Sequence, residues 1–195
     1  TESFYEKYDP ADIRRQQWLE GPQYDKAGNP LLMTDGTQLN YTPHITSLFD
    51  ASNPAKSNEG VRSVKYEYAD GLQGECMDND YVVYRYADIL MMKGEALVRQ
   101  GHPELAVPLF NEVRSRTGLP DYTASDLTLD EIYDERGREF AWEGLRRQDM
   151  IRFGKCCEPR DLKPNESPEY TKLYPIPTNI RKTNVNLKQN SGYPD

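Results

Sequence analysis

The chain has 195 residues, enough for one domain or for one domain with a large appendage. Its 32 acidic residues outnumber its 24 basic ones, and the resulting net charge of −8 argues against a nucleic-acid-binding protein, whose phosphate contacts need a basic face. The sequence contains no apolar run of about 18 residues, which excludes a transmembrane helix, and its 11% aromatic content is too high for a disordered chain.

Residues 1–82 are rich in Gly, Pro, Asn, Asp, Ser and Tyr, which predicts loops, turns and short strands. A short helix is expected early in this region, with Asp9 as its N-cap and the helix continuing through Leu19. The turn-forming residues of 24–30 predict a hairpin or loop tip. Imperfect alternation over 61–68 predicts a strand.

Residues 83–155 have the periodicity of helices. The first helix carries apolar residues at three- and four-residue spacing: Tyr86, Ile89, Leu90, Leu97 and Val98. It is predicted to end at Gly101, and the next helix to start near Pro103. That second helix repeats the spacing with Ala106, Leu109, Phe110 and Val113. Because an interior proline loses a hydrogen bond, this helix must either start late or bend at Pro108.

The helix pair resembles one tetratricopeptide unit, in which small residues let two helices pack closely. Gly94, Ala106, Phe110 and Val113 lie at the corresponding offsets. One such unit cannot bury its faces alone, so further repeats are expected to be degenerate or outside this sequence.

The third helix has the clearest start. Thr128 and Glu131 form a capping box, with Leu127 and Ile132 placed to close it as a hydrophobic staple. We expect the helix to run from Leu129 to about Leu145, to continue through 149–153 and to end at Gly154. Residues 156–195 return to a Pro- and Asn-rich extended tail.

Glu135, Glu139 and Glu143 are spaced four apart on this predicted helix. Paired carboxylates suit glycoside hydrolysis, but that chemistry needs them to face an open cleft. These share a face with apolar residues, which favours a partly buried structural network in which arginines neutralise the carboxylates. The neighbouring arginines expected to do so are Arg136 and either Arg146 or Arg147.

Other catalytic and metal motifs find little support. The sequence has no Gly-x-Ser-x-Gly elbow, no phosphate-binding glycine loop and only two histidines. Its three cysteines suggest unpaired thiols. Asp78, Asn79 and Asp80 offer oxygen ligands for a structural calcium ion, but a solvated turn is the favoured interpretation, and no cofactor or metal is expected.

The loop-rich region suits carbohydrate binding. Aromatic rings can stack on the apolar faces of sugars, while amides, carboxylates and guanidinium groups bond their hydroxyls. Trp18 and Tyr24 flank a Gly-Pro turn and a loop tip and have Arg14 and Arg15 nearby in sequence. The candidate ligand-binding residues are Trp18, Tyr24, Asp25, Asn29 and Tyr41.

Five segments, in order, resemble signature segments of the SusD/RagB family. They are 80–92 continuing through 95–97, 111–118, 132–154, 174–177 and 186–193. The resemblance implies a mainly α fold with tetratricopeptide-like helix pairs and a loop-rich region bearing short strands. It also implies that the rows of Glu and Arg are signatures of the fold.

The resemblance further implies a non-catalytic, outward-facing lipoprotein of the Bacteroidetes outer membrane, used for polysaccharide utilisation and nutrient uptake. Such proteins capture oligosaccharides and deliver them to a SusC-like TonB-dependent transporter, above which they act as a lid. The ligand residues of the family vary with the glycan, so none is carried over to this sequence.

The lipidated N-terminal Cys and long N-terminal helical region of the family are absent from these 195 residues. We therefore expect one C-terminal domain, 1–195, with a loop-rich ligand region (1–82), a helical scaffold (83–155) and a tail (156–195). Any attachment of this domain to a membrane is expected to use a lipid anchor that is not part of these 195 residues. Because some family members handle peptides, peptide capture of the RagB type is an alternative. A second alternative is a tetratricopeptide-type protein-interaction scaffold. A glycosidase that uses Glu139 and Glu143 is a third and less favoured alternative.

Overall fold

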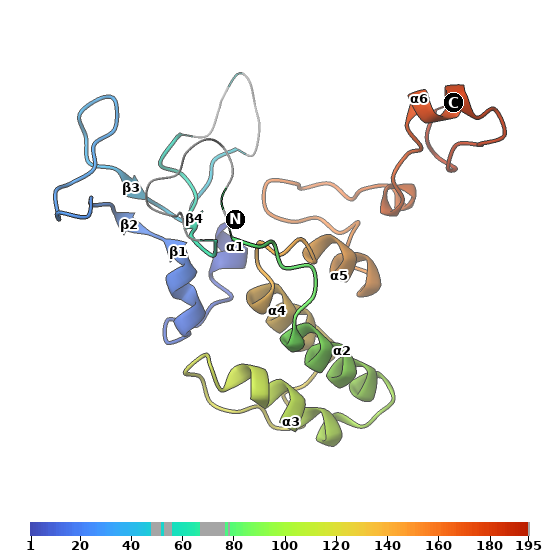
Figure 1. The fold of residues 1–195 in the computed structure, drawn as a ribbon, viewed down its shortest axis with the longest axis horizontal. Helices are drawn as coiled ribbons and strands as arrows, with labels where there is room; N and C mark the ends of the chain where they lie inside the picture. Colours follow the sequence, from blue (N-terminus) through green and yellow to red (C-terminus); the bar gives the residue numbers. More distant parts are fainter. Residues whose placement is uncertain (48–51, 53–55, 67–76, 78, 195) are drawn as a thin grey trace. The chain divides into compact units, whose positions relative to one another are not determined.

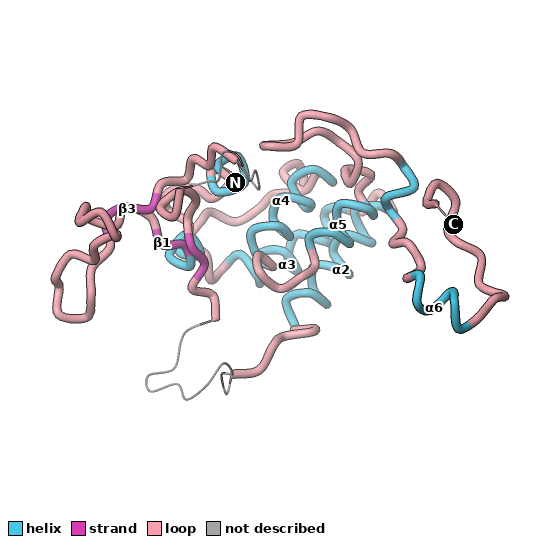
Figure 2. The backbone as a smooth tube through the Cα atoms, turned by 90° about the horizontal axis from the view of Figure 1, so that it is seen from above, coloured by secondary structure: helices cyan, strands magenta, loops and turns pink. Residues whose placement is uncertain are grey.

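The computed structural model describes residues 1–47, 52, 56–66, 77 and 79–194 (Figure 1). Its contacts divide the chain into two compact units, Thr1–Arg146 and Arg147–Asp195. Within the described residues the regular structure consists of six α-helices, two 3-10 helices and four two-residue strands. This composition, which Figure 2 shows along the backbone, confirms the predicted mainly α fold.

The first unit opens with α1 (Glu2–Tyr5) and the 3-10 helix η1 (Ile13–Gln17). The expected helix from Asp9 through Leu19 is wrong at both ends. Asp12 caps η1, because its Oδ1 accepts a hydrogen bond from the Arg14 amide at 2.9 Å. Asp9 instead closes the preceding turn, and the chain leaves the helix as a strand.

The strands form two antiparallel pairs, β1 with β4 and β2 with β3. Their bounds are Trp18–Leu19 (β1), Gly21–Pro22 (β2), Asn40–Tyr41 (β3) and Arg62–Ser63 (β4). Of the strand predicted over 61–68, only β4 is present, and residues 67 and 68 lie outside the described residues. The predicted loop tip at 24–30 is confirmed by an antiparallel bridge between Tyr24 and Pro30.

Helices α2 (Tyr86–Arg99) and α3 (Pro103–Arg114) form the predicted pair (Figure 1). The buried face of α2 is set by Ala87, Leu90, Met91 and Gly94, whose spacing follows the helical turn. Tyr86 and Ile89, which we expected on that face, point outward and are 66% and 51% exposed. The expected buried residues of α3 are confirmed for Ala106, Phe110 and Val113, and the helix starts at Pro103 and continues through Pro108.

Close approach of the two helices depends on Gly94. A Cβ atom built on this glycine would lie 2.5 Å from Cε2 of Phe110, whose ring is 1% exposed. A contact of that length is shorter than van der Waals packing allows, so the ring occupies the space that any other residue would need. The small residue expected from the tetratricopeptide resemblance is therefore required by the packing.

Helix α4 spans Leu129–Glu139 and α5 spans Arg146–Arg152. Thr128 caps α4 as predicted, accepting from the Glu131 amide at 3.1 Å. The expected continuous helix through Leu145 is wrong, because the chain turns after Glu139. Trp142 (φ 64°) and Gly144 (φ 78°) adopt left-handed conformations that an α-helix cannot contain.

The second unit contains most of α5, the 3-10 helix η2 (Glu169–Lys172) and α6 (Thr178–Thr183). Gly154, with φ 76°, follows α5 where its end was predicted. Because η2 and α6 lie in it, the tail after residue 156 is less extended than expected. It is held by side-chain clamps, because Gln189 donates to the Ile176 carbonyl and accepts from its amide.

We predict that Gly94→Ala destabilises the first unit by about 1–3 kcal/mol, although alanine has the higher helix propensity. The added methyl group would displace the Phe110 ring from a packed core. Urea unfolding of Gly94→Ala, Phe110→Leu and the double variant measures the effect. A double variant less destabilised than the sum of its parts is expected, since both changes act at one contact. Additive losses would contradict this account of the helix pair.

Candidate functional site

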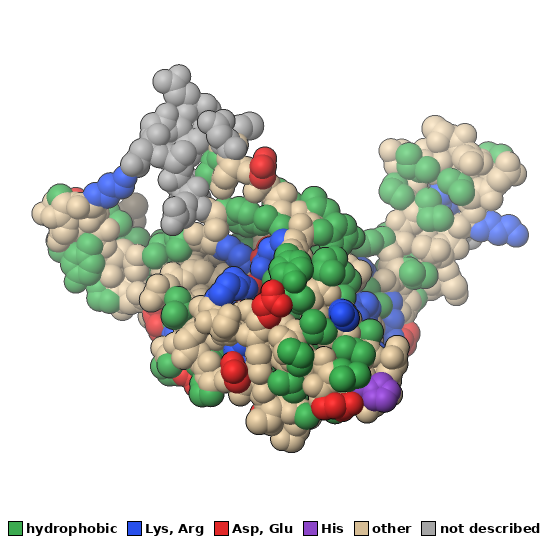
Figure 3. Space-filling model, turned by 60° about the horizontal axis from the view of Figure 1, so that its bottom comes forward, with side chains coloured by type: hydrophobic (Ala, Val, Ile, Leu, Met, Phe, Trp, Pro, Cys, Tyr) green, Lys and Arg blue, Asp and Glu red, His purple; other side chains and the backbone are tan. Residues whose placement is uncertain are grey.

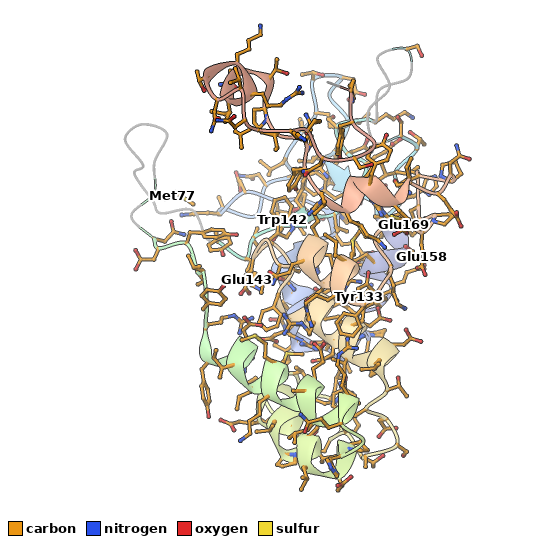
Figure 4. The ribbon with its side chains drawn as sticks, turned by 90° about the vertical axis from the view of Figure 1, so that its right-hand side faces the viewer. Met77, Tyr133, Trp142, Glu143, Glu158 and Glu169 are labelled. Atoms are coloured by element: carbon orange, nitrogen blue, oxygen red, sulfur yellow. The ribbon has the colours of Figure 1, made fainter. Side chains whose placement is uncertain are left out.

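Three carboxylates, those of Glu135, Glu139 and Glu143, lie buried at the centre of the first unit, each at most 5% exposed. Glu135 and Glu139 come from α4, whereas Glu143 comes from the turn that follows it, where Figure 4 shows it beside Trp142. The expectation that all three share one helix is therefore wrong. They converge nonetheless, because the same cations reach more than one of them.

Glu135 accepts hydrogen bonds from two guanidinium groups, and a third, that of Arg114, lies 3.7 Å from its Oε2. Arg14 Nη1 lies 2.8 Å from its Oε1, Arg138 Nη2 lies 2.7 Å from its Oε2, and Tyr122 Oη also donates to it. Burial alone would raise the pKa of Glu135, but the charge of Arg14 and the hydrogen bonds from both arginines outweigh it and lower that pKa to about 2. This carboxyl group is ionised at any physiological pH.

Glu139 accepts from three arginines that come from three different segments. Arg14, Arg85 and Arg116 approach its carboxylate oxygens at 3.0, 2.6 and 2.6 Å. Burial opposes ionisation, but the charge of Arg85 and the hydrogen bonds from Arg116 and Arg85 lower the pKa of Glu139 below its ordinary value. The carboxylate is therefore ionised and fully engaged.

Glu143 completes the network. Arg85 binds it in a bidentate manner, at 2.8 Å through Nε and 2.9 Å through Nη2, and Lys65 forms an ion pair with it. The predicted structural network of carboxylates and arginines is thus confirmed. The expected cations are wrong, however, because the network is built from other basic residues.

The three arginines expected to neutralise these carboxylates have other roles. Arg136 pairs with Asp88 of α2 at 2.9 Å. Arg146 lies 3.6 Å from the ring centroid of Tyr133, which Figure 4 labels, and donates to its carbonyl oxygen. Arg147 donates to the Thr171 carbonyl in the second unit. Sequence proximity therefore misidentified the partners, which, apart from Arg138 of α4, come from other segments of the fold.

Two surface cavities lie on either side of η1. The first, here called the Trp18 cavity, has a volume of about 330 Å³, and the second, the Arg116 cavity, about 470 Å³. Both fall in the size range of small-ligand sites. The Trp18 cavity is lined by Tyr5, Pro10, Ala11, Asp12, Ile13, Arg15, Gln16, Trp18 and Glu20. The Arg116 cavity is lined by Ile13, Arg14, Gln16, Gln17, Val64, Lys65, Arg85, Arg116, Arg138 and Glu139.

The 3-10 geometry of η1 explains this division. With three residues per turn, side chains at i and i+3 lie above one another and successive ones diverge by about 120°. Ile13 and Gln16 form a ridge that borders both cavities. Arg14 faces the Arg116 cavity, whereas Arg15 and Trp18, three residues apart, face the Trp18 cavity.

Trp18 is half-buried and packs edge to face against Tyr8 and Phe4, with ring centroids 6.0 and 6.4 Å away. In the same cavity a polar triad is already assembled. Arg15 Nε donates to Tyr5 Oη at 2.8 Å, and both side chains contact the carboxylate of Glu20. An aromatic ring thus lies with a guanidinium, a hydroxyl and a carboxylate in one cavity.

The other four candidate residues line neither cavity. Tyr24 is 55% exposed at the loop tip. Asp25 and Asn29 are brought together, because the Asp25 carboxylate accepts from the amide and the side chain of Asn29, but these bonds hold the loop itself. Tyr41 in β3 lies under the guanidinium of Arg62 at 4.7 Å. The prediction of ligand contact at these positions is untested.

Sequence reasoning missed Tyr5, Glu20, Lys65 and Arg116. Tyr5 and Glu20 flank the segment containing Trp18, so their proximity to it was the one available signal. Lys65 and Arg116 meet η1 only through the fold.

Among the described residues, no group of three or more His, Cys, Asp or Glu side chains is placed to hold a metal ion. Asp78 of the considered calcium turn, and Cys76, lie outside those residues, while Cys156 and Cys157 are unpaired thiols. No helix in the described part of the chain combines the length and apolarity needed to cross a bilayer.

Comparison with known proteins identifies relatives over nearly the whole chain. The family model described as the SusD family matches residues 1–193. The starch-binding protein SusD of Bacteroides thetaiotaomicron is 33% identical over 124 residues, which cover 60% of this chain and 22% of that protein. SusD-like protein P38 of Formosa agariphila is 31% identical over 116 residues, or 54% of this chain and 23% of that protein.

Solved structures show the same likeness. Surface glycan-binding protein A from Bacteroides thetaiotaomicron, in complex with laminarihexaose, superposes with a TM-score of 0.66 at 26% identity. The match covers 95% of this chain and 39% of that protein. The chain thus spans between about a fifth and two fifths of the length of these relatives.

We predict that acid destabilises the fold through Glu135. Because its pKa is lower in the folded chain than the ordinary 4.5, its ionised form stabilises the fold above about pH 4.5, and this contribution disappears as the pH falls toward 2. Glu135→Gln should lose about 3 kcal/mol at neutral pH and show a shallower loss in acid.

Urea unfolding at a series of pH values measures both effects. Glu112→Gln, an exposed change on α3 with the same loss of charge, is the matched control and should follow the wild-type curve. A Glu135→Gln variant whose stability and pH dependence equal those of the wild type would contradict the assigned role.

Proposed function

This chain belongs to the SusD family, and we propose that it captures oligosaccharides at the outer face of the bacterial outer membrane. The captured glycan passes to a SusC-like TonB-dependent transporter, for which the chain acts as part of a lid. Two relatives support glycan capture by their names, one a starch-binding protein and the other a surface glycan-binding protein solved with laminarihexaose.

The observation that carries the proposal is the Trp18 cavity. An indole ring beside a preorganised Arg15, Tyr5 and Glu20 triad has the two components that sugar recognition needs. The ring offers an apolar face for a pyranose, and the triad offers donors and acceptors for hydroxyl groups. Because the triad is held by its own hydrogen bonds, little ordering would accompany binding.

Two alternatives change the ligand class, and only the first of them keeps the Trp18 cavity. Peptide capture of the RagB type would use the Trp18 ring for an apolar side chain and the Arg15 guanidinium for a carboxylate. A protein-interaction scaffold would instead use the outward side of α2, where Tyr86, Ile89 and Met92 are exposed. A hydrolytic role is disfavoured, because Glu139 and Glu143 are buried and bound by guanidinium groups, which opposes the proton donation that a general acid must perform.

We predict that Trp18→Phe weakens oligosaccharide binding by about tenfold with a small change in melting temperature. Phenylalanine preserves packing on Tyr8 and Phe4 but presents a smaller ring to the sugar. Titration calorimetry against laminarihexaose, maltohexaose and a panel of plant and host oligosaccharides, with assay of new reducing ends, measures binding and hydrolysis together. The other tryptophan of the chain supplies the matched control, Trp142→Phe, which leaves both cavities unchanged.

Equal affinity of wild type and Trp18→Phe would remove the Trp18 cavity from the proposal. Binding of peptides with no binding across the glycan panel would favour RagB-type capture. New reducing ends that disappear in Glu139→Gln or Glu143→Gln variants would establish a glycosidase and overturn the proposal of simple capture.

A further inference from the structure

The Arg116 cavity has a charge that the Trp18 cavity lacks. Of the ten residues that line it among those described, five are basic and one, Glu139, is acidic. The chain as a whole carries a net charge of −8, so this surface departs from the rest of the molecule. Figure 3 shows Lys and Arg side chains gathered near the middle of one face.

The carboxylates that balance these cations lie behind them. Glu135 and Glu143 are 1% and 5% exposed and do not line the cavity. Arg14 and Arg85 use their nitrogens to hold these buried groups, which places the charges of Glu135 and Glu143 inside the protein and the guanidinium groups at the cavity wall, where Glu139 is the one carboxylate among the described lining residues. An anion entering the cavity would therefore meet cations first.

Arg116 provides the donors for such an anion. Its side chain is 58% exposed, and within the described part of the chain it contacts a carboxylate through one nitrogen, Nη2, to Glu139. The remaining edge of a guanidinium group is a planar pair of donors whose geometry matches a carboxylate. Exposed Gln16 on the ridge adds an amide. Lys65 also lines the cavity, but its ammonium group is already engaged by Glu143 and by the Glu139 carbonyl.

The two cavities are adjacent, since the ridge of Ile13 and Gln16 borders each of them. A sugar stacked on Trp18 would therefore have its chain neighbour close to the basic wall. We propose that the Arg116 cavity is a subsite for an acidic sugar, and that the captured glycan contains uronic acid residues whose carboxylate binds Arg116. This inference rests on the proposed capture function and specifies its ligand class.

The test compares acids with their neutral methyl esters, which have the same sugar skeleton. Titration calorimetry of the full chain would use trigalacturonate and its methyl ester, and glucuronate and its methyl ester. In at least one pair the acid should bind about tenfold or more tightly than the ester, as one charge-assisted hydrogen bond provides. Added salt should weaken binding of the acid and leave the ester unchanged.

Substitution should locate the effect. Arg116→Gln should abolish the preference for the acid, and it should fold, because Arg14 and Arg85 still neutralise Glu139. Gln16→Glu, which adds a negative charge at the ridge and removes none of the network's ion pairs, should lower the affinity for the acid. Lys93→Gln, an exposed change on α2 with the same loss of charge, is the control and should retain the preference.

Equal affinities in both pairs, including failure of all four compounds to bind, would overturn the acidic subsite. A preference that persists in Arg116→Gln would overturn it as well. Binding of neutral oligosaccharides that depends on Trp18, without any preference for acids, would leave the capture function in place and remove only this inference. A preference for acids, with affinities that Trp18→Phe leaves unchanged, would retain the anion site and contradict capture through Trp18.

Discussion

The carboxylate of Glu139 is 3% exposed, and an ion taken so far out of water costs several kcal/mol unless cations surround it. Its three guanidinium partners come from η1, from the residue before α2 and from the residues after α3. One buried charge therefore fixes three segments against α4. The first unit cannot loosen any of them without leaving that charge partly unpaired, which makes their arrangement specific.

Among the segments so fixed, η1 depends most on the network. It has five residues and no buried apolar side chain, so neither its length nor a hydrophobic face holds it in place. Asp12 and Arg14 do so instead, because Asp12 caps the helix, binds the Arg14 guanidinium and is 2% exposed. A short helix anchored through one side chain leaves its other faces open, and those faces border the two cavities.

The parts of this fold that the sequence predicts are those determined by close neighbours along the chain. The Thr128 cap and the end of α5 near Gly154 depend on a few adjacent residues, and both are present. The break after Glu139 had one local signal, Gly144, which is a poor helix former and adopts a positive φ, but nothing in residues 140–143 indicates that Trp142 does so too. The partners of Glu139 could not be predicted either, because Arg14 lies 125 residues away and only the fold brings them together. Trp18 was identified from the composition of the loop-rich region, whereas the basic side chains around Arg116 are brought together only by the fold.

The network's two faces have different requirements. Inside, each carboxylate needs a cation, and a guanidinium group with five donors can satisfy two carboxylates at once, as Arg14 and Arg85 do. At the surface no carboxylate is needed, so an arginine that reaches the buried charge with one nitrogen, as Arg116 does, retains donors that face solvent. A lysine could not bind a buried carboxylate with one edge and a ligand with another, because its ammonium is a compact point charge and not a planar array of donors. Stabilisation and recognition can therefore use opposite edges of the same side chain, and a structural network of arginines carries at its surface the donors that an anion site needs.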